Sequence, residues 1–246
     1  MPPGPRWIRQ FHKPSSPGSP LLLIFPHAGA GASAYRAFSK AFSAHYEVLV
    51  FQYPGRQDRV HEPAPATLPE FAAGAFTEFS DTDRYRDVPI TTFGHSMGAV
   101  VSFEFVRLAE AAGVGIDRAY ISAAVAPHIA ETKEPAPKDD EALLDHLTRL
   151  EGTTGDVMTN RDLMRMTLPV VKQDHAASER YSCTDDVRIQ APIHAIGGDN
   201  DPIVTLAELN GWRKHSAEVD ITVFEGGHFY LNDYVDELAE LITPRA

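Results

Sequence analysis

The chain has 246 residues, of which 43% are hydrophobic and 23% charged, the composition of an ordinary soluble globular protein. Its 22 Lys and Arg residues against 34 Asp and Glu residues give a formal net charge of −12, which opposes a phosphate backbone and excludes nucleic-acid binding. A single cysteine, Cys183, cannot form an internal disulfide. No apolar run reaches the roughly 18 residues of a membrane span, and the N-terminus lacks the pattern of a signal peptide, so we expect a cytoplasmic protein.

The first twenty residues are expected to form an extended N-terminal arm. They contain six of the nineteen prolines, although Trp7, Ile8 and Phe11 are suited to hold the segment against the body. The globular part is expected to cover residues 21–246, a length that fits one α/β domain.

Strand-like and helix-like patterns alternate along the globular part. Short, continuous apolar runs predict buried strands at 21–25, 46–51, 90–93, 119–125, 193–196 and 221–224. Apolar residues at helical spacing predict helices at 34–42, 68–79, 100–111 and 234–242. This alternation predicts an α/β fold with a mostly parallel sheet that is covered on both faces.

One segment, from about residue 129 to 182, breaks the alternation. It contains no β-branched run, and its apolar residues have helical spacing between breaks rich in Gly, Thr and Asp. A helical insertion of this size after a core strand predicts a lid. A pair of additional packing helices is the alternative.

A G-x-S-x-G pentapeptide, Gly94-His95-Ser96-Met97-Gly98, lies between a predicted strand and a predicted helix. This context is typical of a nucleophile elbow, in which the serine occupies a strained turn and the flanking glycines let strand and helix approach closely. A glycine-rich turn with an incidental serine is the alternative. We predict that Ser96 is a nucleophile.

A serine nucleophile needs a base within hydrogen-bond reach and an acid that orients the base. His228 follows the strand 221–224 on a glycine-flanked turn, and Asp199 and Asp201 follow the strand 193–196. Both loops lie at strand carboxyl ends, the edge at which the elbow serine also emerges. His228 is therefore the predicted base. Either aspartate could be the acid, and spacing alone gives only a slight preference to Asp201.

An oxyanion formed during acyl transfer needs two hydrogen-bond donors. The N–H group of Met97, directly after the nucleophile, is one candidate, and the other is expected in the loop after the first core strand. Small residues in that loop, 25–31, permit close approach of backbone to ligand, and the N–H group of Ala28 is the candidate. His27 is expected to shape the loop through a hydrogen bond.

Five motifs in register along the chain carry a family resemblance. They are Phe-Pro-His-Ala-Gly at 25–29, Gln-Tyr-Pro-Gly-Arg at 52–56, Gly-His-Ser-Met-Gly at 94–98, Gly-Asp-x-Asp at 198–201 and Gly-Gly-His-Phe-Tyr-Leu at 226–231. Together they resemble the type II thioesterases of polyketide and nonribosomal peptide pathways. The resemblance implies an α/β-hydrolase fold with a helical lid, a triad of Ser96, His228 and Asp201, and oxyanion donors on Ala28 and Met97.

The resemblance also implies an activity: hydrolysis of acyl thioesters from the phosphopantetheine arm of carrier proteins, which clears misprimed or stalled chains. In that reaction Ser96 attacks the acyl carbon, His228 takes and returns the proton, Asp201 holds the imidazole, and water releases the acyl group. The expected partners are acyl or peptidyl carrier proteins and the acyl thioester itself. We expect a monomer that needs no metal and no organic cofactor, and that binds neither nucleic acid nor membrane.

Two other functions stay open at this point. One is a small-molecule esterase or aminopeptidase of the same fold. The other is an inactive hydrolase-fold scaffold, against which the complete set of nucleophile, base and acid argues.

Two expectations concern how substrate and carrier are bound. The lid methionines Met158, Met164 and Met166 are flexible and adapt to irregular apolar surfaces, so we predict that they line an acyl chamber, with core filling as the alternative. Since both the chain and carrier proteins of this kind are acidic, docking is expected to use a local patch of basic and apolar residues. The residues predicted for this patch are Arg56, Arg59, Arg161, Arg165 and Lys172.

Overall fold

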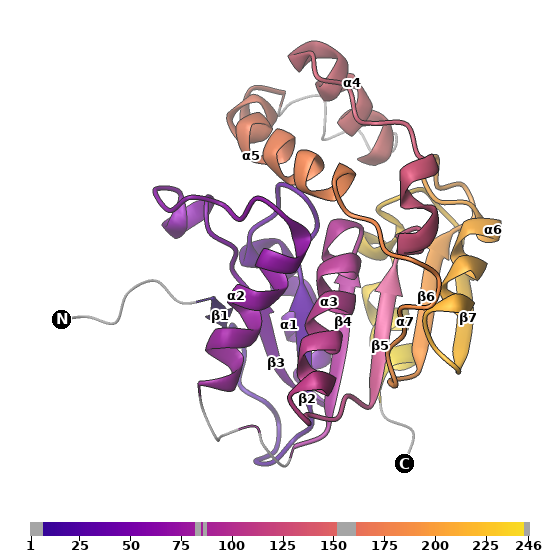
Figure 1. Cartoon of the computed structure of the whole chain (residues 1–246). Coiled ribbons are helices and arrows are strands. Elements are labelled where there is room, and N and C mark those ends of the chain that lie inside the picture. The colour runs from indigo at the N-terminus through magenta and orange to yellow at the C-terminus, as the bar shows by residue number, and fades with distance from the viewer. Residues whose placement is uncertain (1–6, 82–84, 86–87, 152–160, 244–246) are drawn as a thin grey trace.

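The described residues form a seven-stranded sheet at the centre of the molecule (Figure 1). In this computed structural model the described residues are 7–81, 85, 88–151 and 161–243. The strands are β1 (Ile8–Arg9), β2 (Leu21–Phe25), β3 (Glu47–Phe51), β4 (Ile90–His95), β5 (Arg118–Ser122), β6 (Ile193–Gly198) and β7 (Val219–Phe224). Their order is β1-β3-β2-β4-β5-β6-β7, and every neighbouring pair is parallel except β1 and β3. The predicted fold class, an α/β-hydrolase fold with a mostly parallel sheet, is confirmed.

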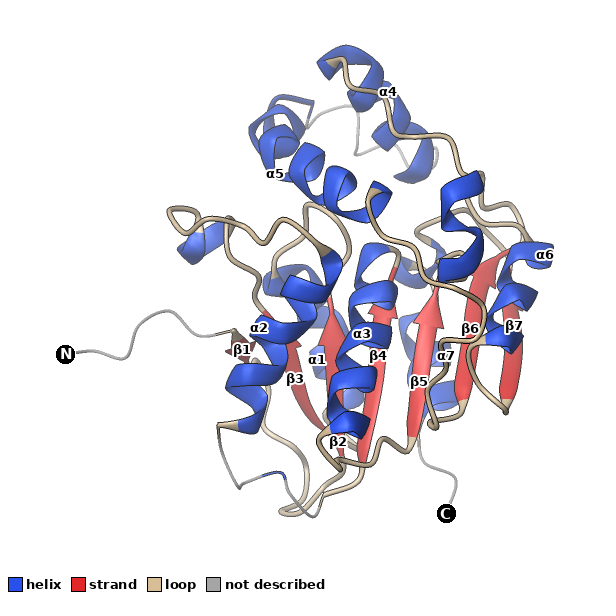
Figure 2. Ribbon diagram, in the orientation of Figure 1, coloured by secondary structure: helices blue, strands red, loops and turns tan. Residues whose placement is uncertain are grey.

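Helices cover both faces of the sheet (Figure 2). The helices α2 (Leu68–Ser80) and α3 (Met97–Ala111) lie on one face, and α1 (Arg36–Phe42) and α7 (Val235–Ile242) lie on the other. All five residues of β2 are fully buried, because a strand in the middle of such a sheet is covered from both sides. The shorter helical segments are η1 (Ala32–Tyr35), η2 (Gln57–Arg59), η4 (Pro127–Thr132), α6 (Leu206–Leu209), η6 (Asn210–Lys214) and η7 (Tyr230–Asn232).

The helices α4 (Asp140–Glu151) and α5 (Arg161–Glu179) lie above the carboxyl ends of the strands (Figure 1). They are inserted between β5 and β6, and we refer to η4, α4 and α5 together as the lid. Leu143 and Leu144 of α4 form a small apolar cluster with Leu168 and Val171 of α5. Within the described residues of the segment 129–182, the predicted helical insertion is therefore present. Among the helices of the described residues, none combines the length and the apolar surface needed to span a lipid bilayer.

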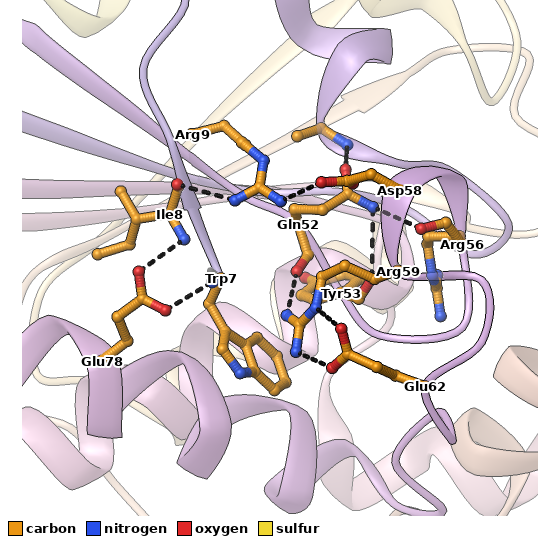
Figure 3. A network of polar contacts seen from close by, with 11 residues as sticks. Trp7, Ile8, Arg9, Gln52, Tyr53, Arg56, Asp58, Arg59, Glu62 and Glu78 are labelled. Carbon is orange, nitrogen blue, oxygen red and sulfur yellow. Dashed lines mark hydrogen bonds and ion pairs between the residues drawn. The ribbon is translucent and has the colours of Figure 1, made fainter. Parts of the chain in front are cut away.

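The N-terminal segment departs from the expected arm, because it enters the sheet (Figure 3). Ile8 pairs antiparallel with Phe51 of β3, and Glu78 of α2 accepts the N–H groups of Trp7 and Ile8 at 2.6 and 3.3 Å. The Trp7 ring fills a slot in α2 at Gly74, where an added Cβ would lie 2.1 Å from the ring. Residues 7–9 are therefore part of the body of the protein. A strand of two residues beside prolines has no periodicity from which it could be predicted.

Candidate active site

The elbow predicted around Ser96 is present between β4 and α3. Ser96 has φ 54° and ψ −124°, a conformation that costs a non-glycine residue about 1–3 kcal/mol. A Cβ on Gly94 would lie 2.2 Å from the carbonyl oxygen of Gly98, and a Cβ on Gly98 would lie 2.0 Å from that of Phe25. Only glycine fits at these two positions. The two glycines therefore permit the sharp turn that places Ser96 at the N-terminus of α3.

The structure brings Ser96, His228 and Asp201 together in one chain of hydrogen bonds. The Ser96 hydroxyl lies 3.0 Å from Nε2 of His228, and Nδ1 of His228 lies 2.8 Å from Oδ2 of Asp201. The side chains of His228 and Asp201 are almost completely buried. These residues are 132 and 27 positions apart in sequence, and the three strand ends after β4, β6 and β7 bring them together.

Asp201 is held by backbone groups on the side that faces away from His228. Its Oδ1 accepts the N–H groups of Ile203 and Val204 at 2.8 and 3.2 Å, which leaves Oδ2 for the histidine. Because an ionised carboxylate only accepts, Nδ1 of His228 carries the proton, and Nε2 is the acceptor that faces the Ser96 hydroxyl. His228 is thus held in the tautomer that a general base requires.

Asp199, the other candidate acid, does not reach His228. It is exposed, and its Oδ1 accepts the N–H group of Gly226 and the side-chain amide of Asn200, both at 2.8 Å. Asp199 therefore ties the loop after β6 to the loop that carries His228. Of the two aspartates that the spacing left open, Asp201 is the one whose carboxylate lies within hydrogen-bond distance of His228.

Two further histidines lie near His228: the ring of His95 is 5.1 Å from that of His228, and the ring of His27 is 5.8 Å from that of His95. The pKa of His27 is lowered to about 3, mainly by burial, and the electrostatic interactions with His228 and Arg56 contribute to the same shift. Burial also lowers the pKa of His95 well below its usual value. Nδ1 of His27 lies 2.9 Å from the hydroxyl of Tyr35, in keeping with the loop-shaping contact expected for it. Both rings are neutral near pH 7 and are weak bases, so neither competes with His228 for the serine proton.

The two predicted oxyanion donors, Ala28 and Met97, lie beside Ser96 in the wall of one cavity. Met97 is the first residue of α3, where N–H groups have no partner within the helix and the helix dipole favours negative charge. Among the hydrogen bonds of the described residues, the N–H groups of Ala28 and Met97 donate none. Both are therefore available to an acyl oxygen bound at Ser96.

The cavity has a volume of about 950 Å³ and lies between the lid and the carboxyl edge of the sheet. Ser96 and His228 form part of its wall, and residues 130–137 after β5 form another part. The lid helices contribute polar side chains: His146, Arg149, His175, Ser178 and Glu179. The chamber therefore combines small apolar residues near the serine with polar groups on the lid side.

The lid methionines do not line this cavity where they can be placed. Met166 is 77% exposed, and Met164 packs against the apolar cluster between α4 and α5. Met158 lies outside the described residues. For Met164 and Met166 the prediction of an acyl-chamber lining is wrong. Met164 shares the face of α5 that turns toward α4, and Met166, two positions along the helix, lies on the opposite face.

The predicted basic docking patch is also wrong for two of its members. Arg56 and Arg59 are only 4% and 5% exposed; Arg56 pairs with the buried Asp174, and Arg59 pairs with the partly exposed Glu62. Arg165 and Lys172 are more exposed and pair with Glu141 and Asp140 of α4. The side chain of Arg161 is not among those described.

Two side chains that the sequence analysis gave no role support the loop that carries Ala28. Oε1 of Gln52 accepts the N–H group of Ala32 at 2.8 Å, and its amide donates to the carbonyl of Arg56 at 3.2 Å (Figure 3). Asp174 of α5 accepts the N–H group of Gly29 at 2.8 Å. Gln52 lies in the quoted Gln-Tyr-Pro-Gly-Arg motif, which was a signal for it, whereas Asp174 lies in no motif.

The site has the organisation of a serine hydrolase of the α/β-hydrolase class: an elbow serine, a buried histidine and carboxylate, and two free backbone donors. The residues described contain no group of three or more His, Cys, Asp or Glu side chains that could hold a metal ion. Residues 20–245 match the family model of the thioesterase domain, and the chain belongs to this thioesterase family.

Individual relatives agree with this assignment. Thioesterase PikA5 of Streptomyces venezuelae is 36% identical over 239 residues, which cover 96% of this chain and 84% of that protein. The phenyloxazoline synthase MbtB of Mycobacterium tuberculosis is 38% identical over 239 residues, which cover 96% of this chain. The chain spans only 16% of the length of that synthase.

A solved structure resembles the chain over most of its length. The type II thioesterase BorB from the borrelidin biosynthetic cluster has a TM-score of 0.84 and 35% sequence identity, with 96% of each chain covered. The family resemblance inferred from the five sequence motifs is confirmed.

Proposed function

We propose that the protein is an editing thioesterase, which hydrolyses acyl thioesters from the phosphopantetheine arm of carrier proteins in polyketide or nonribosomal peptide biosynthesis. The observation that carries the proposal is the hydrogen-bonded series Ser96, His228 and Asp201 at the wall of a cavity in a chain of the thioesterase family. The relatives PikA5 and BorB, a thioesterase and a type II thioesterase from a biosynthetic cluster, support it.

The reaction proceeds in two acyl transfers. The Ser96 oxygen attacks the thioester carbon as its proton passes to Nε2 of His228, and the Asp201 carboxylate stabilises the resulting imidazolium. The N–H groups of Ala28 and Met97 stabilise the tetrahedral oxyanion. The intermediate expels the phosphopantetheine thiol, which takes the proton from His228. A water, deprotonated by His228, then attacks the acyl-enzyme and restores Ser96.

A thiol leaves more easily than an alkoxide or an amine, so protonation of the leaving group is less demanding. The oxyanion donors then carry a larger share of the rate enhancement, and removing one such donor typically costs about 2.7–4 kcal/mol of barrier. This mechanism uses side chains and backbone groups alone and requires no metal or organic cofactor.

The partners follow from the substrate. The acyl group reaches Ser96 on a phosphopantetheine arm, so the enzyme docks acyl or peptidyl carrier proteins at the mouth of the cavity. Arg56 and Arg59 are buried and take no part in this docking. A monomeric state and a cytoplasmic location stay predictions from the sequence.

The test is a hydrolysis panel of acyl-carrier proteins, acyl-CoA thioesters and matched oxygen esters, with Ser96→Ala as the control. The proposal expects turnover of thioesters, highest on carrier proteins, and none with the variant. Preference for oxygen esters or peptide amides would assign the chain to the esterases or aminopeptidases of the same fold. No turnover together with no labelling of Ser96 by a fluorophosphonate would indicate an inactive scaffold.

A further inference from the structure

A buried carboxylate of the lid contacts the loop that carries the oxyanion donor Ala28. Asp174 of α5 is fully buried, and its Oδ2 accepts the N–H group of Gly29 at 2.8 Å. The same oxygen accepts Nη1 of Arg56 at 2.6 Å, and Oδ1 accepts Nη2 of Arg56 at 2.8 Å. The carboxylate is thus shared between a guanidinium and one backbone amide.

The contacted amide belongs to the central peptide of a tight turn. The N–H group of Ala30 donates to the carbonyl of His27 at 3.1 Å, and Gly29 has φ +77°, as the third residue of a type II turn requires. Rotation of the Ala28–Gly29 peptide would convert this turn to type I and point the carbonyl of Ala28 at Asp174. A carboxylate accepts the N–H group and repels a carbonyl oxygen, so Asp174 fixes this peptide in one orientation.

Arg56 holds the carboxylate in place. Its Nε donates to the carbonyl of Pro54 at 3.2 Å, and its guanidinium lies over the rings of Tyr53 and Phe71 at 5.2 and 5.6 Å. Because Nε, Nη1 and Nη2 of Arg56 all donate hydrogen bonds, the guanidinium and the Asp174 carboxylate are held in a single relative orientation.

The helix α5 also packs directly on the same turn. A Cβ on Gly29 would lie 2.5 Å from Cγ2 of Val171, which is three residues before Asp174 and on the same face of the helix. The turn is therefore held by one side chain through packing and by the other through a hydrogen bond, and both come from the lid.

We propose that Asp174 is a positioning residue for the oxyanion site, and that α5 completes this site by fixing the turn that presents the N–H group of Ala28. The inference rests on the proposed function, in which Ala28 stabilises the tetrahedral intermediate. Stability alone does not account for the pair, because replacing a buried ion pair by apolar residues of similar volume is often neutral or stabilising. Such a replacement would lose the bond to Gly29, together with the bonds that Arg56 donates to the carbonyls of Pro54 and Ala30.

The main variant is Arg56→Met combined with Asp174→Leu, which removes the Gly29 acceptor without leaving a buried charge unpaired. The conservative variant is Asp174→Asn, whose amide oxygen can take the place of Oδ2 and keep Gly29 and one Arg56 contact. The matched control is Lys172→Gln with Asp140→Asn, which removes an ion pair that α5 makes with α4 at the surface of the lid.

Each variant is assayed for kcat and KM on a p-nitrophenyl ester and on an acyl-N-acetylcysteamine thioester. Rates are normalised to the amount of fluorophosphonate-reactive Ser96, and the melting temperature is measured. The dissociation constant of an alkylboronic acid, which forms a tetrahedral adduct on the serine, reports on the oxyanion site.

The double variant is expected to keep its melting temperature and KM, to lose about tenfold to a hundredfold in kcat, and to bind the boronic acid more weakly by a similar factor. Asp174→Asn is expected to be less stable and yet to keep kcat within about fivefold, since it loses one Arg56 contact and retains the acceptor. The control keeps all values. The double variant therefore loses kcat without losing stability, and Asp174→Asn loses stability without losing much kcat. If Asp174 had only a structural role, the two losses would occur together.

Unchanged kcat and boronic acid affinity in the folded double variant would overturn the inference. If that variant does not fold, Asp174→Ala is compared with Asp174→Asn, and equal kcat per reactive serine would overturn it instead. A wild type that hydrolyses the p-nitrophenyl ester and no thioester would refute the proposed function alone, because the ester still reports on the oxyanion site.

Discussion

Replacing Asp201 by asparagine tests which nitrogen of His228 carries the proton. In the wild type, Oδ1 of Asp201 accepts the N–H groups of Ile203 and Val204, and Oδ2 accepts Nδ1–H of His228. An asparagine has one oxygen and one NH2 group for these two sides. If the NH2 group faced the backbone, two buried donors would lose their acceptor, whereas only one is affected if it faces His228.

The magnitude follows from this count. Each buried donor left without an acceptor costs about 1–3 kcal/mol, so the orientation with NH2 toward His228 is favoured by about that amount. His228 avoids the remaining conflict by moving its proton from Nδ1 to Nε2. With Nε2 protonated, the ring cannot accept the Ser96 proton, and kcat is expected to fall by about 10³- to 10⁴-fold, comparable to the loss for the same change in a serine protease triad.

The assay is steady-state hydrolysis of an acyl-N-acetylcysteamine thioester, followed with a thiol-reactive chromogen, and nitrogen NMR of the histidine ring reports the tautomer. Asp199→Asn is the matched control, because the amide oxygen of the variant can keep both contacts of Oδ1, to Gly226 and Asn200. Its kcat is expected within about twofold of wild type, because Asp199 does not bond to His228 and exposed substitutions usually change stability by no more than about 0.5 kcal/mol. Equal impairment of the two variants, or less than tenfold loss in Asp201→Asn, would refute the reasoning.

Four further outcomes are expected. Ser96→Ala folds and loses hydrolysis. Ser96→Gly loses hydrolysis as well but is more stable than Ser96→Ala by about 1 kcal/mol in urea unfolding, because glycine relieves the backbone strain at φ 54°; equal stabilities of the two variants would contradict this strain. Gly98→Ala, whose Cβ would lie 2.0 Å from a carbonyl oxygen, destabilises by about 3 kcal/mol, whereas Gly115→Ala, with no atom within 4 Å, is neutral; equal denaturation midpoints would argue against a close approach at the elbow. Since the pKa of His27 is lowered to about 3, mainly by burial, unfolding takes up a proton below a pH of about 6.5; the free energy of unfolding is therefore full above that pH and falls toward pH 3 by up to about 1.4 kcal/mol per pH unit. His27→Gln should reduce this slope, and an unchanged slope would argue against the lowered pKa of His27. Chelators leave hydrolysis unchanged, and inhibition by EDTA that zinc reverses would contradict a metal-free mechanism.

The sheet could be predicted from sequence where burial is continuous. Residues 21–25 are all apolar because β2 is covered on both faces, and such a run is visible without any tertiary information. The start of α3 was harder to predict from the sequence. The helix begins at Met97, whereas apolar periodicity begins only at Val100, since the small residues after the elbow carry no amphipathic pattern.

The site could be predicted where a local motif fixes the geometry, as at Ser96 and His228. The choice between Asp199 and Asp201 depends on how one loop folds, which spacing does not encode. Arg56 was expected at the surface because charged side chains usually lie there. Its partner Asp174 is 118 positions away in sequence, so their burial as a pair is a property of the tertiary structure.

The packing of Trp7 decides where the protein can be shortened. The match to the family model begins at residue 20, so a truncation designed on family boundaries would remove β1. It would open the outer edge of β3, whose unpaired backbone groups are a template for association with a second chain, and would empty the slot at Gly74. Affinity tags and fusion partners therefore belong ahead of residue 7, with the Trp7 segment left intact.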